Sequence, residues 1–422
     1  WKFMKDLLEV CWHLSTLHKE EKIYDERWAF VCISHQNIAL RILEWLGKPL
    51  KNDFLYDLEK ILDRTRRDAP GQEVDTAASA TGESLTDQEK MDLWFSYLFS
   101  GLAMLNSDTL DLEGSSKNRR KVVLEQAGDI RNDVCDKIRE VWGALGNRKY
   151  SMIKQLVEPL LRLADLKHEK TKALSTDMYL SLFSEELKRS NNFSLIRFVT
   201  INAVDLIVTE RSLLRPQPTR TGLNNNNNSN GSSNGGKSKT HAPGQGFEEL
   251  FDVRLRKKFR SDPLLNTGET LDFLSEVTKL FSLLSVLSKF GNKGDLEYED
   301  EQTQAMLRLM AYLKKAQRDD MFVKYVERLK KIHRDLNNHS EAAQVLLMHA
   351  TYPWEENKDV PALTMDQATT WPSESIENRR IRVYRKAIDL YALGKNWEKC
   401  LAYCELLRTF YEREFMYEKL SS

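Results

Sequence analysis

The chain has 422 residues, with 63 Lys and Arg balanced by 63 Asp and Glu, so its formal net charge is zero. That balance argues against a nucleic-acid-binding protein, because neutralising phosphates requires an excess of cations. Five cysteines, an odd number in a chain long enough to bury a core, favour a reducing, cytoplasmic compartment. The sequence has no apolar run of the ~18 residues that a membrane-spanning helix needs. Because the chain begins at Trp1, we expect a piece of a longer soluble protein.

Apolar residues spaced by three and four dominate the sequence and predict helices along most of its length. Thr86-Asp87-Gln88-Glu89 is a capping box. Its threonine hydroxyl accepts an N–H of the first turn, and its glutamate reaches back to the threonine N–H. Further helices are predicted near Thr267, over residues 322–336, and after Asn396, a favourable N-cap.

Strand patterns are scarce. The best candidate, Phe198 to Ile201, lies within the apolar stretch from Leu195 to Val208, which is more typical of a buried helix. Each predicted helix carries one apolar face, so it must pack on neighbouring helices. The sequence therefore predicts an all-α fold, an armadillo- or HEAT-like helical solenoid of stacked antiparallel helices, although it shows no clean repeat length.

Three segments interrupt the helical pattern. Residues 66–84, rich in small and acidic residues, predict a mobile loop, and residues 352–372, with three prolines and two tryptophans, predict an ordered loop. Residues 216–246 contain five consecutive asparagines, followed by Ser, Gly and Lys, and have almost no apolar side chains to bury. This composition predicts a disordered linker between two halves of the chain.

One motif within that linker has the pattern of a phosphate-binding loop. Gly231 to Ser238 matches the pattern, with Lys237 as the candidate phosphate ligand of an ATPase. The chemistry requires a strand before the loop and a helix after it, so that backbone amides converge on the phosphates. Polyasparagine precedes this motif and Pro243 follows it. A chance match in a Gly- and Ser-rich tract is the better interpretation.

Other candidate residues favour structural roles. Cys400 and Cys404 lie one helical turn apart without the further ligands of a zinc site. His333, His339 and His349 form no metal-binding or hydrolase pattern. No Ser-His-Asp or Cys-His set is recognisable, so we assign no catalytic, cofactor-binding or metal-binding residue.

A basic cluster interleaved with apolar residues is a candidate contact surface. It suits anionic membrane lipids or an acidic partner, whereas the favoured alternative is a solvated helix face above apolar anchors. The cluster consists of Arg254, Arg256, Lys257, Lys258 and Arg260.

Several motifs occur in an order that resembles a known family. The opening of an exchange region is similar to residues 325–336, followed by 340–350 and Trp354. The later helices of that region are similar to residues 394–400 and 411–421. Residues 17–22, 127–131, 138–142 and 267–270 resemble the helical region that precedes it. The family is DOCK (dedicator of cytokinesis), whose members are guanine-nucleotide exchange factors. Departures are Gln344, the Tyr352-Pro353 pair, and the inserts at 66–84 and in the Asn-rich tract.

The resemblance implies four segments. Residues 1–215 form a helical repeat region, 216–246 the linker, and 247–300 a continuation of the repeat region. Residues 301–422 form the first lobe of the exchange region, which makes the homodimer. In the family, two further lobes hold the GTPase and a nucleotide sensor, and no residue of those lobes has a counterpart in this chain.

The resemblance also implies a function. The parent protein would release GDP from a Rac-type small GTPase in the cytoplasm, with recruitment to the plasma membrane, an adaptor of the ELMO type and anionic lipids as further partners. This chain would supply scaffold and dimerisation. The alternative is a non-catalytic helical-repeat scaffold or adaptor. We expect dimer contacts on the last helix pair, unless these residues pack the lobe's own core: Trp397, Tyr403, Leu406, Phe410 and Tyr411.

Overall fold

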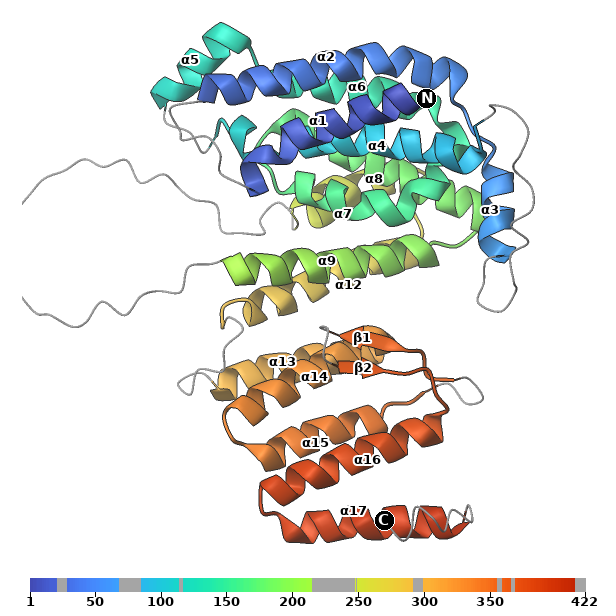
Figure 1. The fold of residues 1–422 in the computed structure, drawn as a ribbon, viewed down its shortest axis with the longest axis vertical. Helices are drawn as coiled ribbons and strands as arrows, with labels where there is room; N and C mark the ends of the chain where they lie inside the picture. Colours follow the sequence, from blue (N-terminus) through green and yellow to red (C-terminus); the bar gives the residue numbers. More distant parts are fainter. Residues whose placement is uncertain are drawn as a thin grey trace, which may run out of the picture. The chain divides into compact units, whose positions relative to one another are not determined.

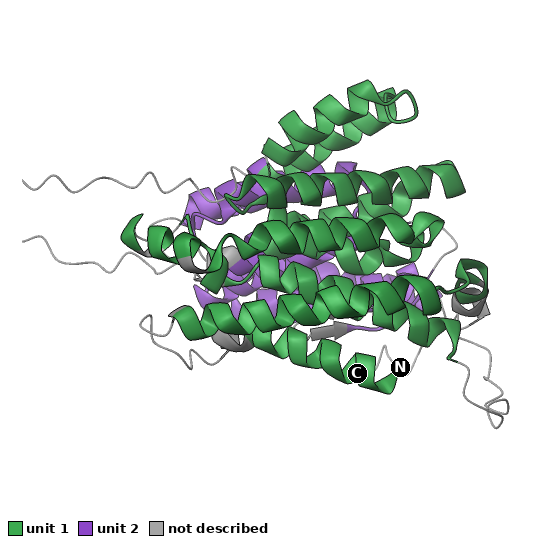
Figure 2. Ribbon diagram, turned by 90° about the horizontal axis from the view of Figure 1, so that it is seen from above, with its two compact units in different colours: residues 1–207, 220–281 green, residues 208–219, 282–422 purple. Residues whose placement is uncertain are grey.

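The structure, a computed structural model, describes residues 1–20, 29–67, 85–113, 117–214, 247, 249–290, 299–354, 359–365 and 369–413. Helices make up most of the described chain, which confirms the predicted all-α class. Residues 68–84 of the predicted loop and the whole 216–246 tract, including Lys237, lie outside the described residues. Figure 2 colours two compact units: unit 1 comprises Trp1–Ile207 and Arg220–Phe281, and unit 2 comprises Val208–Thr219 and Ser282–Ser422. The four segments expected from the sequence stay predictions.

Unit 1 consists of stacked helices (Figure 1). Helix α1 packs on α2 and α4, α2 packs on α6, and α7 packs on α8. Its elements, with the ends of α9 and α12 assigned to unit 2, are α1 Lys2–Glu20, α2 Ala29–Asp53, α3 Leu58–Arg67, α4 Asp87–Leu105, η2 Asp108–Leu110, α5 Lys117–Ala127, α6 Ile130–Ala144, η3 Gly146–Met152, α7 Ile153–Ala164, α8 Glu169–Ser190, α9 Ser194–Leu214, the π-helix η4 Glu249–Leu255, α11 Arg256–Ser261 and α12 Gly268–Leu287.

Capping groups fix several helix ends as the sequence predicts. At the start of α4, the Thr86 hydroxyl accepts a hydrogen bond from the Glu89 N–H at 3.3 Å. The Glu89 carboxylate accepts one from the Thr86 N–H at 2.9 Å, which confirms the capping box. In unit 2, the Asn396 side chain accepts from the Lys399 N–H at 3.3 Å, as expected of the predicted N-cap.

The apolar stretch from Leu195 to Val208 forms part of α9, so its helical interpretation is confirmed. A buried carboxylate on the preceding helix caps α9. Glu186 of α8 accepts hydrogen bonds from the N–H groups of Leu195 at 2.7 Å and Ile196 at 2.8 Å. The tight connection depends on Asn191, whose φ of 53° lies in the left-handed region. This cap fixes the path of the chain from α8 into α9.

Unit 2 is a succession of helices with one small hairpin. Helix α15 packs on α14 on one side and on α16 on the other, and α17 packs on α16. The elements are α13 Glu299–Lys315, α14 Asp319–Asp335, α15 His339–Ala350, β1 Leu363–Met365, β2 Thr369–Trp371, α16 Ile376–Leu393 and α17 Trp397–Arg413.

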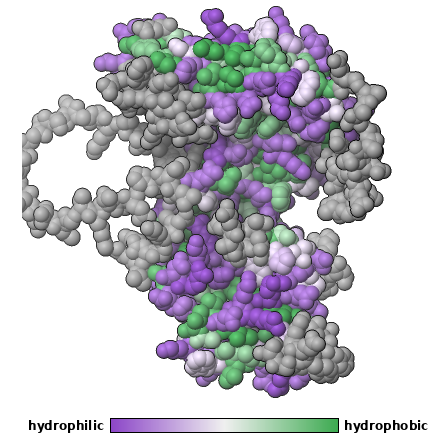
Figure 3. Space-filling view, in the orientation of Figure 1, coloured by the Kyte–Doolittle hydropathy of each residue, from purple (hydrophilic) through white to green (hydrophobic). Residues whose placement is uncertain are grey.

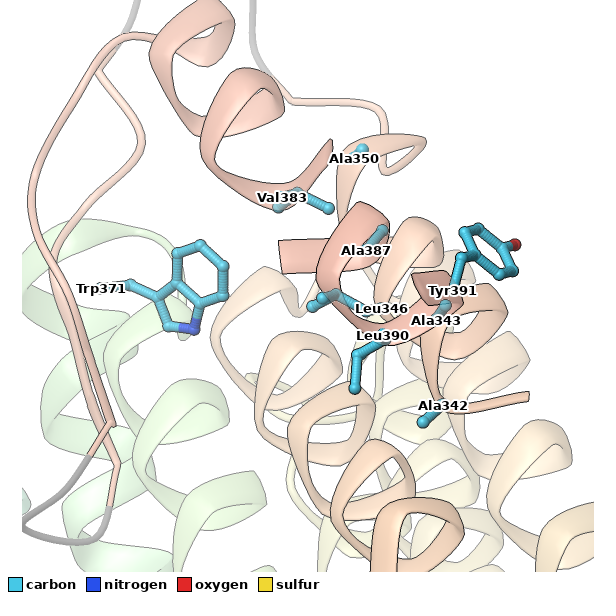
Figure 4. Packing of buried hydrophobic residues seen from close by; sticks show 9 residues of the cluster. All are labelled: Ala342, Ala343, Leu346, Ala350, Trp371, Val383, Ala387, Leu390 and Tyr391. Atoms are coloured by element: carbon cyan, nitrogen blue, oxygen red, sulfur yellow. The ribbon is translucent and has the colours of Figure 1, made fainter. Parts of the chain in front are cut away.

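The core between α15 and α16 combines small and large residues. Figure 4 shows the alanines of α15 beside the side chains of α16, where their small size permits close approach of the two helices. The buried cluster contains Ala342, Ala343, Leu346, Ala350, Trp371, Val383, Ala387, Leu390 and Tyr391.

The hairpin was not predicted. Strands β1 and β2 pair antiparallel, with Leu363 opposite Trp371 and Met365 opposite Thr369. A further bridge joins Val360 to Glu374. The sequence predicted an ordered loop here, and the short strands lack the alternating pattern that identifies longer ones. The hairpin is a local exception within an all-helical fold.

Candidate functional site

The turn between α16 and α17 positions the last helix. Gly394 lies against Ser340 at the start of α15: a Cβ on Gly394 would approach the Ser340 hydroxyl oxygen to 2.8 Å and its backbone nitrogen to 3.1 Å. Lys395 follows with a φ of 55°. The absence of a side chain on Gly394 therefore permits the close turn that sets α17 beside α16.

The inner face of α17 packs on its own lobe. Leu407 and Tyr411 are buried. Tyr403 lies against two aromatic residues of α16, with ring centroids 5.9 Å from Tyr391 and 5.5 Å from Tyr384. Of the residues expected at a dimer surface, Tyr403 and Tyr411 thus contribute to the packing within unit 2, as the alternative interpretation held.

The outer face of α17 carries large apolar side chains. Trp397 is 60% exposed and Leu401 is 69% exposed, and Leu393 at the end of α16 is 63% exposed. We call these three residues the apolar stripe. Leu406 is also exposed, on another side of the helix, whereas Phe410 is half-buried. Of the five candidate dimer residues, Trp397 and Leu406 are exposed, and the dimer contact itself stays a prediction. Leu393 and Leu401 are also exposed and were not among the candidates.

Figure 3 shows that hydrophobic side chains reach the surface of each unit among hydrophilic ones. Isolated exposed apolar residues are common on soluble proteins, but a continuous group of large ones marks a contact surface. In the apolar stripe, Trp397 and Leu401 lie four residues apart on one face of α17, and Leu393 is the last residue of α16, before the turn that leads into α17. No sequence signal other than this spacing identifies it.

His349 is a structural residue at the base of the hairpin. It is fully buried, and burial together with the charge of Arg379 lowers the pKa of His349 to about 3. An Arg379 guanidinium nitrogen lies 3.4 Å from His349 Nε2, so Nε2 accepts and the ring is neutral. The rings of Trp371 and Trp354 lie 4.7 Å and 5.6 Å from the imidazole centroid. This environment favours the neutral imidazole near neutral pH.

Arg379 fastens the hairpin segment to α16. Its side chain is completely buried and donates hydrogen bonds to Glu374 at 2.8 Å, to the Pro361 carbonyl at 3.3 Å and to the Pro372 carbonyl. The guanidinium also lies 5.2 Å from the Trp371 ring centroid, which is a cation–π distance. A single side chain therefore joins both sides of the hairpin to the helix core.

The other candidate histidines and cysteines lie in different surroundings. His333 is buried, with Nδ1 3.3 Å from Glu299, and His339 is half-buried at the start of α15. Cys404 is exposed and Cys400 is half-buried. Within the described residues, no group of three or more His, Cys, Asp or Glu side chains has the arrangement of a metal site.

Most of the basic cluster is engaged in ion pairs. Arg254 donates to Glu249 at 2.6 Å and to Glu169 at 2.7 Å. Arg256 pairs with Asp252 at 3.2 Å.

Lys258 pairs with Asp177 of α8. Lys257 and Arg260 are exposed and pair with no carboxylate in the described part of the chain. The structure therefore leaves two of the five predicted cations available, and the lipid or acidic-partner contact stays a prediction.

A polar depression of about 380 Å³ lies beside the start of α4 in unit 1. Its carboxylates have internal partners: Asp87 accepts from the Asp57 N–H at 3.0 Å, and Glu59 accepts from Arg189 at 2.8 Å. These contacts brace the connection before α3 rather than assemble a reactive set. No helix in the described ranges is both long and apolar enough to span a bilayer.

The two units define an all-helical protein of the stacked, solenoid class. The profile of the family described as "Dedicator of cytokinesis (DOCK) TPR region" matches residues 72–212, so this part of the chain is similar to that family. Dedicator of cytokinesis protein 3 from Mus musculus and Homo sapiens is 22% identical over 360 residues, covering 82% of this chain. Dedicator of cytokinesis protein 4 from Homo sapiens is 23% identical over 330 residues, covering 78% of this chain. The chain spans only 15–16% of the length of these relatives.

Proposed function

We propose that this chain is the scaffold and dimer-forming part of a guanine-nucleotide exchange factor for Rac-type small GTPases. The observation that carries the proposal is the similarity to two dedicator of cytokinesis proteins across 78–82% of the chain. The motif order at residues 325–350 and 394–421 supports assignment of residues 301–422 to the first lobe of an exchange region. Exchange itself would be performed by lobes outside these 422 residues.

The parent reaction needs no covalent chemistry. An exchange factor accelerates GDP release by binding the nucleotide-free GTPase more tightly than the GDP-bound form. The contribution of this chain is rigidity, since an exchange lobe must be held in a fixed orientation. Arg379 in unit 2 and Glu186 in unit 1 support that role, because each buried polar side chain joins two segments of its own unit by hydrogen bonds.

The apolar stripe supports dimerisation through unit 2. A second copy of the chain would cover Leu393, Trp397 and Leu401 with the same residues across a twofold axis. Buried tryptophans commonly dominate such interfaces, each contributing about 2 kcal/mol or more. Of the five residues expected from the sequence, Trp397 and Leu406 remain available, whereas Tyr403 and Tyr411 contribute indirectly by holding α17 in place.

The exchange assay compares two lengths of the protein. We expect the 422-residue chain alone to leave the rate of labelled-GDP release from Rac unchanged, and the longer polypeptide that contains it to accelerate release. Catalysed release by the chain alone would contradict the placement of the active lobes elsewhere. Absence of release with the longer polypeptide, on Rac and on other small GTPases, would favour the alternative of a non-catalytic scaffold.

The dimer is tested by sedimentation equilibrium. Trp397→Ser with Leu401→Ser is expected to raise the dimer dissociation constant by about 100-fold or more, corresponding to the loss of two anchors. Leu307→Ser is the control, because Leu307 of α13 is a 39% exposed leucine in the same unit. A monomeric wild-type chain, or an equal effect of the control substitution, would rule out the apolar stripe as the dimer surface.

Partner recruitment completes the proposal. An adaptor of the ELMO type and anionic membrane lipids would bring the cytoplasmic parent protein to the plasma membrane. These partners follow from the family resemblance, and co-purification of the longer polypeptide with such an adaptor is the measurement that checks the first of them.

A further inference from the structure

Helix α5 has a surface that the proposed exchange function does not use. It begins with Lys117, Arg120 and Lys121, all exposed, and continues with Leu124, which is 37% exposed. These positions are spaced three and four residues apart, so the four side chains lie on one face of the helix. We call this set the cationic face of α5. It combines three positive charges with one partly exposed leucine, and clustered basic residues favour contact with an anionic surface.

The charges of this face are not neutralised within the protein. Lys117 and Arg120 have no hydrogen-bond or ion-pair partner in the described part of the chain. Lys121 approaches Glu125 at 3.7 Å, but both side chains are more than 60% exposed, so water screens the pair. The basic cluster of η4 and α11 differs, because three of its five cations pair with carboxylates.

Helix α5 stands apart from the stacked helices of unit 1. Figure 1 shows it at the margin of the unit, and it packs over no extended interface with another described element. Val123 is the one large apolar side chain that the described part of α5 buries. The helix ends at Ala127. Gly128 follows with a φ of 69°, which supplies a left-handed cap, and nothing lies within 4 Å of the position that its Cβ would occupy.

We propose that the cationic face of α5 docks on the surface of an anionic phospholipid membrane. A helix at the margin of the unit, without neighbouring walls, offers no groove to grip a peptide, but it can lie flat on a planar surface. Lysine and arginine would meet the headgroups, and Leu124 would reach the acyl boundary. Charge complementarity is provided by three cations, of which two are unpaired. This inference does not depend on exchange activity.

The expected binding free energy is that of one contact among several, not of a contact that holds the protein at the membrane alone. A basic residue near an anionic leaflet contributes ~1 kcal/mol, which corresponds to roughly fivefold in affinity. Three such residues give a weak but measurable affinity that falls as salt screens the surface. The contact would therefore orient a protein that other interactions also hold at the membrane.

Vesicle co-sedimentation of the 422-residue chain tests the proposal. The probes are phosphatidylcholine vesicles with and without phosphatidylserine. The variant Lys117→Gln/Arg120→Gln removes two unpaired cations from α5. The matched control, Arg41→Gln/Lys154→Gln, removes one arginine and one lysine of the same unit that are exposed and have no partner in the described part of the chain. Circular dichroism establishes that both variants are folded.

We expect the wild-type chain to bind only the phosphatidylserine vesicles, and the α5 variant to bind them roughly 30-fold more weakly. The control should retain binding close to the wild-type value. Equal losses in the two variants, or equal binding to both kinds of vesicle, would overturn the assignment to α5. So would binding to polyglutamate as tight as to vesicles with no effect of Leu124→Ser, which would indicate an acidic protein partner instead.

Discussion

Arg131 donates two hydrogen bonds to Glu113, at 2.6 Å and 3.0 Å, and so joins α6 to the segment that follows η2. The same guanidinium donates to both carboxylate oxygens of Asp129, at 2.9 Å each. The Arg131 side chain is 5% exposed, and its partners are 18% and 19% exposed. Arg131 thus forms ion pairs with two largely buried carboxylates and offsets the cost of burying their negative charge.

Replacing this arginine should destabilise unit 1 strongly. In Arg131→Met, the two carboxylates would lose their cation while remaining in place, which typically costs about 3–5 kcal/mol. The free energy of unfolding from urea denaturation measures the loss. Arg139→Met, on the same helix but with an exposed partner, should cost less than about 1 kcal/mol. An equal loss of unfolding free energy in the two variants would show that the buried network does not stabilise unit 1.

The network also predicts weaker stability in acid. Burial acts to raise the pKa of Asp129, but the hydrogen bonds and charge of Arg131 outweigh it and hold that pKa below its usual range. A carboxylate with a depressed folded-state pKa stabilises the protein above its unfolded pKa of about 4, and this contribution is lost as the pH falls through the folded value.

His168 adds to the pH dependence of stability, at a higher pH than Asp129. Burial, followed by the charge of Arg131, lowers the pKa of His168, so folding favours the neutral ring. Its stabilising contribution is complete above the unfolded pKa of about 6.5 and declines as the pH falls below it. We expect the urea concentration at the midpoint of unfolding to decrease as the pH is lowered below about 6.5. In His168→Gln, the decrease at the upper end of this pH range should be smaller. A midpoint that rises on acidification would contradict both assignments.

Loss of the capping box of α4 should lower the stability by less than loss of Arg131 does. Thr86→Ala removes the acceptor for the Glu89 N–H and should cost about 1 kcal/mol of stability. Thr86→Ser keeps a hydroxyl at the same position and should retain most of that free energy. Thermal denaturation of the three proteins checks the order, and an alanine variant as stable as the wild type would exclude the cap as a stabilising element.

Two glycines should respond to alanine in opposite directions. Gly394→Ala places a Cβ against Ser340, including its backbone nitrogen at 3.1 Å, and overpacking of this kind costs roughly 1–3 kcal/mol. Gly143 lies in α6 with nothing within 4 Å of its would-be Cβ, so Gly143→Ala should stabilise the helix by up to about 1 kcal/mol. The unfolding free energies of the two variants test this prediction. If both variants are stabilised, or both are destabilised, the neighbours of the two Cβ positions do not explain the effects.

Much of the fold could be predicted because its signals are local. The capping box at Thr86 and the N-cap at Asn396 depend on residues three positions apart, and both occur as predicted. The helix predicted near Thr267 is α12, and three of its apolar residues, spaced three and four apart, are buried: Val277, Phe281 and Leu284. Strands β1 and β2 were missed, because three-residue strands carry too little pattern to distinguish them from a loop.

The sequence by itself determined that the chain is a set of helices with apolar faces, and the order of its motifs pointed to the DOCK family. Only the tertiary structure decided which side chains those helices cover. On α17 it buries Tyr411 and exposes Leu401, and in the basic cluster it pairs Lys258 with Asp177, 81 residues away. Periodicity defines a helix face, but coverage and charge pairing depend on neighbours that are distant in the sequence.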